Sequence, residues 1–271
     1  EMIKQDINLL EYPLWFQNDR EAERCDDGFV WRHPKGFVFR TGFKPPVRTD
    51  IIFLLYLLLQ SQERDWDSEI FLTRYQVIKG CGLTKDARWY ARLEESLTRW
   101  EQVRIEFNGA FYNGRKYETF HFGVIDSWGL EEDSGSGKAL RVRLSQEYIS
   151  VIKETSYCQF LNFSQIKSLR SPLATRLYQI LIKTFKSRNS WKINAKVLAE
   201  KIPMKKKYPS QIVQEIRPAV NRIARHTDLK VSMTVEKKSR GTIFIVFRKE
   251  EESKGSNLER ESSSDTFSLP K

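Results

Sequence analysis

The sequence has few of the residues that build metal centres or disulfide frameworks. Its three cysteines, Cys25, Cys81 and Cys158, lie far apart and form no Cys-x-x-Cys spacing, which argues against disulfides and against a zinc knuckle. Its three histidines are isolated from one another and form no His-x-His pair. We therefore predict no metal site and no cofactor.

Long apolar runs are also missing. No stretch reaches the roughly 18 consecutive apolar residues that a membrane span needs, and the first residues lack the basic-then-apolar pattern of a signal peptide. The 271 residues suffice for two ordinary domains, and an apolar content of 40% is ample for packed cores. We expect a soluble, cytoplasmic protein that does not contact a membrane.

A complete catalytic motif is the third absence. Residues 135–138 (Gly-Ser-Gly-Lys) match the end of a phosphate-binding loop, but the position of the first required glycine is Glu132. The residue after the lysine is Ala139, where the motif needs serine or threonine. Neighbouring carboxylates would repel phosphate, so this segment is interpreted as a connection between strands and the chain is not predicted to be an enzyme.

Positive charge is abundant and unevenly distributed. The whole chain has a formal net charge of +11, and segment 190–250 alone holds fifteen Lys or Arg against five Asp or Glu. Nearly all of the excess therefore lies in less than a quarter of the length. A charge concentrated in this way predicts a polyanionic partner.

The basic segment predicts a helix followed by a hairpin. A short helix from Asn194 to Ile202 precedes a lysine run, and a longer helix extends from about Ser210 to His226. Strands Leu229–Val235 and Thr242–Phe247 then form the hairpin. Along the longer helix, isoleucines and valine recur at helical spacing and define a buried face. Pro218 lies inside this helix, so we expect a kink or break near Arg217, because proline cannot donate the backbone hydrogen bond.

Duplex DNA is the predicted partner of this segment. Amide and guanidinium groups suit base edges, and lysines suit phosphates. The residues predicted to read bases are Gln211, Gln214, Asn221 and Arg225. The residues predicted to hold phosphates are Lys205, Lys206, Lys207, Ser210, Arg217, Arg222, Lys237, Lys238 and Arg240. The alternative interpretation is an ordinary amphipathic surface helix with a solvated charged face.

The first half predicts a similar order of elements. A buried helix capped by Thr49 or Asp50 extends to Glu63. A short strand at 70–72, a helix capped by Thr73 and a third helix from Thr84 to Trp100 follow. Strands are expected at 104–111, 117–128 and 140–144. A basic stripe on the third helix predicts a secondary DNA contact through Lys85, Arg88, Arg92 and Arg99. Because segment 84–118 has a net charge of only about +1, we expect self-association to be its main role.

These patterns predict an α+β chain of tandem winged-helix domains, each with a three-helix core and a β-hairpin wing. Residues 1–48 form an aromatic arm with a hairpin that packs on the first domain. Residues 49–144 form winged helix 1, which would hold a homodimer together. Residues 145–249 form winged helix 2, the main DNA-binding domain, and 250–271 are expected to be a disordered tail.

Several motifs are similar to those of a known family. The run Ile216–Val231, the basic turn Glu236–Arg240 and the closing strand Ile243–Phe247 resemble the carboxy-terminal domain of bacterial plasmid replication initiator (Rep) proteins. Segments Phe71–Tyr75, Tyr90–Arg99, Thr119–Phe122 and Leu169–Tyr178 resemble replication initiator A proteins. The likeness covers about residues 50–248. One departure is that Gly241 follows Arg240, whereas the family places a glycine before that arginine.

The resemblance implies an initiator that binds direct repeats (iterons) at a plasmid origin in the bacterial cytoplasm. It also implies melting of adjacent AT-rich DNA, recruitment of host DnaA and the replicative helicase, and a switch between initiating monomers and repressing dimers. Two alternatives stay open. A winged-helix transcriptional regulator would bind DNA without a replication role, and an interaction module would place the basic face against an acidic protein.

Overall fold

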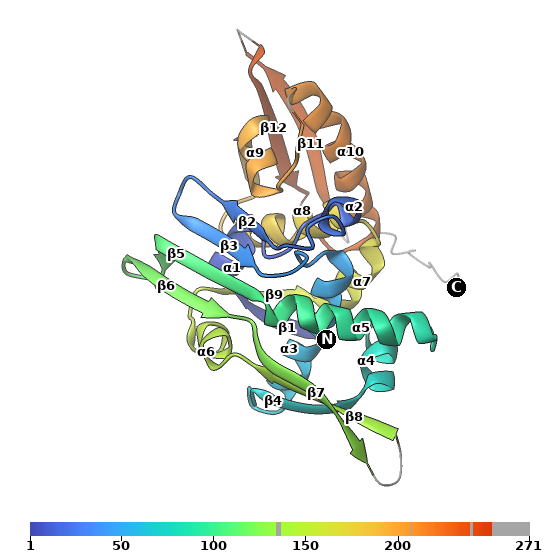
Figure 1. Cartoon of the computed structure of the whole chain (residues 1–271). Helices are drawn as coiled ribbons and strands as arrows, with labels where there is room; N and C mark the ends of the chain where they lie inside the picture. Colours follow the sequence, from blue (N-terminus) through green and yellow to red (C-terminus); the bar gives the residue numbers. More distant parts are fainter. Residues whose placement is uncertain (134–136, 207, 239–240, 251–271) are drawn as a thin grey trace, which may run out of the picture.

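The computed structural model has an α+β fold (Figure 1), as predicted, and describes residues 1–133, 137–206, 208–238 and 241–250. The predicted tail therefore lies almost entirely outside the described residues. The amino-terminal segment contains β1 (Met2–Asp6), α1 (Ile7–Glu11), α2 (Asp19–Ala22), β2 (Phe29–Arg32) and β3 (Phe37–Thr41). Strands β2 and β3 pair antiparallel, which confirms the predicted hairpin of the arm. None of the described helices combines the length and apolar character needed to cross a bilayer.

The first half is built around a helix that is buried almost all round. Its elements are α3 (Arg48–Glu63), β4 (Glu69–Thr73), α4 (Arg74–Gly80), α5 (Ala87–Glu101), β5 (Val103–Tyr112), β6 (Tyr117–Gly123), β7 (Ile125–Asp133) and β8 (Gly137–Leu144). Helix α3 begins one residue before the predicted caps, and Asp50 accepts a hydrogen bond from the Val47 amide at 2.7 Å. Thr73 caps α4 as predicted, whereas α5 is capped by Asp86 rather than by Thr84.

The strands of the first half divide between two sheets. Strands β5 and β6 join the amino-terminal hairpin in a four-stranded sheet of order β2-β3-β5-β6, whereas β7 joins a three-stranded sheet of order β4-β8-β7. The single strand predicted over 117–128 is therefore wrong, because the chain leaves one sheet after Gly123 and enters the other at Ile125. At this break the alternation of apolar residues is interrupted by the adjacent buried pair Val124 and Ile125.

The last six elements of the second half repeat the order of elements in the first half once β5 and β6 are set aside. The elements of the second half are α6 (Gln146–Glu154), β9 (Cys158–Asn162), α7 (Phe163–Leu169), α8 (Pro172–Thr184), β10 (Ser190–Asn194), α9 (Ala195–Lys201), α10 (Pro209–His226), β11 (Val231–Lys237) and β12 (Ile243–Lys249). Its sheet has the order β10-β12-β11. Elements α8 to β12 thus match α3 to β8, and the matching strands β4 and β10 each pair with the last strand, which is central in its sheet.

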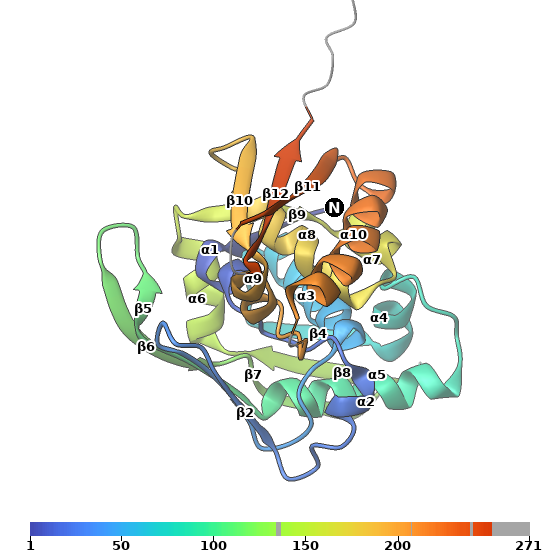
Figure 2. The same ribbon diagram turned by 90° about the horizontal axis from the view of Figure 1, so that it is seen from above.

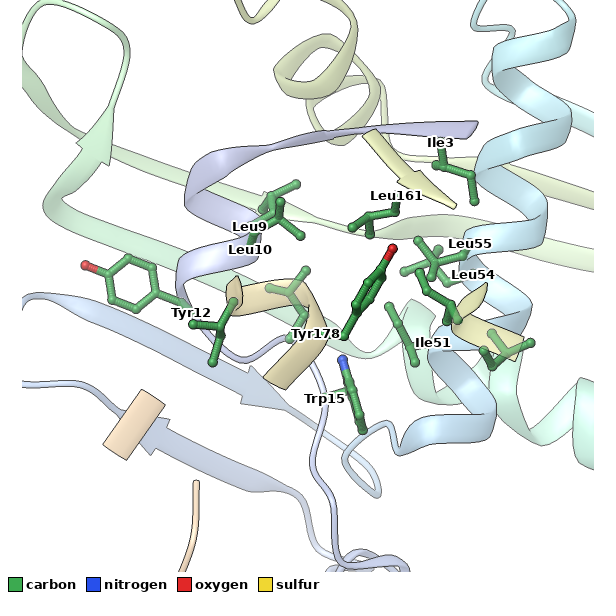
Figure 3. Close-up of a cluster of buried hydrophobic side chains, with 14 of the residues drawn as sticks. Ile3, Leu9, Leu10, Tyr12, Trp15, Ile51, Leu54, Leu55, Leu161 and Tyr178 are labelled. Carbon is green, nitrogen blue, oxygen red and sulfur yellow. The ribbon is translucent and has the colours of Figure 1, made fainter. Parts of the chain in front are cut away.

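The amino-terminal segment joins the two halves. Strand β1 pairs antiparallel with β9, and the side chains of β1, α1, α3, β9 and α8 form one cluster (Figure 3). Within this cluster, the indole of Trp15 donates to the side-chain oxygen of Gln179 at 3.3 Å. The segment predicted to cover only the first domain thus contacts both halves. In Figures 1 and 2, α10 and the β5–β6 hairpin lie on opposite sides of the molecule.

Two arginines donate hydrogen bonds across this junction. The guanidinium of Arg176 is fully buried and donates to the carbonyls of Leu10 at 3.1 Å, Glu11 at 2.9 Å and Lys201 at 3.3 Å. Burial lowers the pKa of Arg176 to about 9, which still leaves it charged near neutral pH, and the carbonyls accept the hydrogen bonds of its buried donors. The second arginine, Arg48 at the start of α3, donates to the hydroxyl of Thr175 in α8 at 3.1 Å. The position of α8, and of the helices packed on it, is thereby fixed relative to the first half.

Gly36, at the turn between β2 and β3, is expected to tolerate no side chain. Its φ is +91°, and a Cβ built there would lie 2.3 Å from the carbonyl oxygen of Asn108. We expect Gly36→Ala to lower the free energy of unfolding by about 1–3 kcal/mol, measured by urea denaturation. Gly109→Ala is the control, because Gly109 has φ +62° but no atom within 4 Å of a built Cβ. Equal losses in both variants would contradict the proposed clash.

Candidate nucleic-acid interface

Helix α10 forms where the sequence predicts it and buries the predicted apolar face. Pro209 occupies its first turn, and Ile212, Ile216, Val220 and Ile223 are buried against α8, α9 and β11. The helix continues from Pro209 to His226 without a break, so the predicted break near Arg217 is absent. Pro218 is exposed, so neither its ring nor the carbonyl left without a helical donor disturbs the core.

The opposite face of α10 carries the residues predicted to read bases. Gln211, Gln214, Asn221 and Arg225 are all exposed. In the part of the chain that the structure describes, Arg225 and the exposed Arg217 form no ion pair with a carboxylate. Their charges are therefore available to an external anion.

Arg222 is placed differently from the other two arginines of α10. Its guanidinium donates to the carbonyl of Leu169, at the end of α7, over 3.3 Å. Arg222 therefore ties α10 to α7 while its charge stays at the edge of the outward face. The phosphate contact predicted for Arg222 can still form, because its guanidinium carries other N–H donors.

Lysines lie at the amino-terminal end of α10. Lys205 pairs with Glu21 of α2 at 2.8 Å, and Lys206 pairs with Glu215 of α10 at 2.8 Å. Both pairs are exposed, and pairs of this kind contribute little, so phosphates can replace the carboxylates. Ser210, in the first turn, is exposed, and the predicted contact Lys207 lies outside the described residues.

The β11–β12 hairpin runs beside α10. Only residues 227–230 separate α10 from β11, so the chain reverses and the end of the hairpin lies near the amino-terminal end of the helix (Figure 1). Lys237 and Lys238 are exposed on β11 and just after it. The ammonium groups of Lys192 and Lys238 each lie 5.3 Å from the centre of the Phe244 ring. The predicted contact Arg240 lies outside the described ranges.

Part of the basic stripe predicted on α5 is wrong. Lys85 and Arg88 are exposed, but Arg99 is 0% exposed and Arg92 is largely covered. Both guanidinium groups pair with the carboxylate of Asp50, which is also 0% exposed. Because these two arginines compensate a buried charge, they are not available to DNA. The secondary contact is thus reduced to Lys85 and Arg88.

The hairpin of the first half adds basic residues that the sequence did not single out. Arg141 and Arg143 of β8 are exposed and share the carboxylate of Glu69, at 4.0 and 3.1 Å. Their alternation with the buried residues Leu140, Val142 and Leu144 is the signal in the sequence that places them on the outward face of this strand. Across the described ranges, no cluster of three or more His, Cys, Asp or Glu side chains is placed to hold a metal ion.

Comparisons with known proteins concern both the sequence and the fold of this chain. A protein-family model described as "Replication initiator protein A" matches residues 49–228. None of the curated proteins compared with the chain matches it. A crystal structure of domains 2 and 3 of RctB is similar over 83% of this chain and 91% of that one, with TM-score 0.56 and 12% identity. A second crystal structure of RctB domains 2–3 is similar over 82% of this chain and 90% of that one, with TM-score 0.48 and 10% identity. At this identity the likeness concerns the fold.

Proposed function

Because the chain belongs to the replication initiator protein A family, we propose that it initiates plasmid replication by binding direct repeats of the origin through α10. The family match covers α3 through α10, which includes the predicted reading helix and the elements that hold it. The observation that carries the proposal is the outward face of α10. There exposed amide and guanidinium groups share the most basic part of the chain with lysines that precede α10 and lysines on the hairpin.

Each half is proposed to be a winged helix. In the second half, α8, α9 and α10 would form the three-helix core and β11–β12 the wing. In the first half, α3, α4 and α5 would form the core and β7–β8 the wing, which replaces the hairpin expected from the sequence. The shared strand orders β4-β8-β7 and β10-β12-β11 support this assignment.

In the proposed complex, α10 enters a major groove and its outward side chains meet base edges. Lys205 and Lys206 at one end of the helix, and Lys237 and Lys238 on the hairpin, hold phosphates on either side. The first half would contribute a weaker contact through Lys85 and Arg88 and would carry the homodimer interface. Recruitment of host DnaA and the replicative helicase would follow DNA binding, and no catalytic step is assigned to the chain.

A footprint on the plasmid's own origin tests this function directly. Protection of regularly spaced direct repeats is the expected result. A second assay asks whether the protein and a cloned repeat array sustain replication of a plasmid that has lost its own initiator. Binding without replication would point to a transcriptional regulator instead. Indifference to duplex DNA at low salt would remove the proposal.

Arg225→Ala is expected to weaken binding to the origin repeat by about 1–3 kcal/mol and to relax the preference at one base pair. The measurement is a competition titration with single-base variants of the repeat. Lys206→Ala is the matched control, because a lysine that holds a phosphate should weaken binding to all sequences alike. Equal effects of the two substitutions on all sequences would remove the base-reading role of Arg225.

A further inference from the structure

Pro218 lies at the centre of the outward stripe of α10. Counting from Gln211, the residues Gln214, Pro218, Asn221 and Arg225 follow at separations of three or four residues, which places all five along one face of the helix. All five are exposed. The stripe that carries the proposed base-reading groups therefore has one apolar member, and that member occupies the middle position.

Proline gives this position two chemical properties. Its ring is a compact apolar surface without a hydrogen-bond donor. It also has no backbone N–H, so the carbonyl of Gln214, four residues earlier, loses its usual helical donor. Gln214 and Pro218 both lie on the exposed side of α10. An interior proline is unfavourable for a helix, yet Pro218 lies inside α10 on its exposed face.

An A·T base pair presents matching chemistry in the major groove. Thymine places its C5 methyl group there, and the paired adenine places an amino donor on the same groove edge, with thymine O4 between the two. We propose that Pro218 is a specificity-determining residue whose ring contacts the methyl group of one thymine near the middle of the bound repeat. The carbonyl of Gln214 would accept a hydrogen bond from the paired adenine. This inference rests on the proposed function, since it requires α10 to lie in a major groove.

The test removes the methyl group from the DNA one position at a time. The probe is a duplex carrying the repeat that the footprint of the wild-type protein defines, with each thymine replaced in turn by uracil. We expect one replacement to weaken wild-type binding about three- to fivefold, the effect of losing one buried methyl group. Pro218→Ala, which removes the ring and restores the N–H, should bind the thymine and uracil forms of that position equally. It should also unfold at a higher temperature, because alanine suits a helix better.

The outcomes separate this inference from the function on which it rests. If the wild-type protein prefers the repeat but responds to no uracil replacement, the methyl contact is wrong and the function stands. The same holds if Pro218→Ala keeps the wild-type response at the sensitive position. If the wild-type protein shows no preference for the repeat, the function itself fails. The uracil series on the wild-type protein gives its answer even if the variant does not fold.

Discussion

Replacing Asp50 with alanine is expected to lower the free energy of unfolding by about 3–5 kcal/mol, because it would strand buried charges. Asp50 and Arg99 are both 0% exposed. Nη2 of Arg92 lies 2.8 Å from Oδ1 of Asp50, and Nη1 of Arg99 lies 3.5 Å from Oδ2. The same carboxylate accepts a hydrogen bond from the Val47 amide at 2.7 Å. One side chain thus holds the start of α3 and the middle and end of α5.

The free energy of unfolding is expected to fall because Asp50 compensates the buried positive charge of Arg99. Although burial acts against its charge, the carboxylates of Asp50, Glu95 and Glu23 raise the pKa of Arg99 above its ordinary value. Without Asp50, the guanidinium would depend on Glu23 and Glu95, whose side chains are 47% and 32% exposed. Removing one partner of a buried pair costs far more than removing an exposed pair, because the remaining charge is left without compensation.

Urea denaturation followed by circular dichroism measures the effect. Glu118→Ala is the matched control, since Glu118 pairs with Lys116 at 3.2 Å in an exposed position where Lys116 is 73% exposed. This substitution should lower the free energy of unfolding by less than about 1 kcal/mol. If Asp50→Ala costs no more than this control, Arg92 and Arg99 are not held by Asp50 and could again be considered as DNA contacts.

This network shows which features the sequence could predict. Helix α10 was predicted nearly to the residue because its buried and exposed faces follow from local spacing, from Ile212 to Ile223. On α5, the same logic assigned Arg99 to the exposed side. Its partner Asp50 is 49 residues away and Glu23 is 76 residues away, so local spacing carries no sign of the burial.

The missed strands have the same cause. Strands β9 and β10 have five residues each, and their partners β1 and β12 are distant in the chain. Helix α7, of seven residues, was also missed. Short strands that form through distant pairing leave little periodicity of their own. Helix α7 does carry a local signal, because Asn162 caps it and Phe163, Ile166 and Leu169 are buried at a spacing of three. The division of segment 117–133 between two sheets likewise depends on which distant strands are available.

Replacing Gln211, Gln214, Asn221 and Arg225 together with alanine is expected to abolish the preference for the origin repeat. Specific sites are bound about 10³- to 10⁷-fold more tightly than unrelated DNA, and this advantage comes largely from base contacts. All four side chains are exposed, and alanine favours a helix, so α10 and its buried face should persist. The measurement is the ratio of dissociation constants for the repeat and for a scrambled duplex, at one fixed salt concentration.

A second quadruple variant isolates the contribution of phosphate contacts to binding. Replacing Lys205, Lys206, Lys237 and Lys238 with alanine removes four proposed phosphate contacts while leaving the four reading side chains in place. Affinity for both duplexes should fall, and the slope of log affinity against log salt should decrease by about 0.9 for each lost contact. The reading-face variant should keep the wild-type slope, because its only substituted cation is Arg225. If that variant instead keeps its preference for the repeat, bases are read by the hairpin or by the first half, and α10 does not read the repeat.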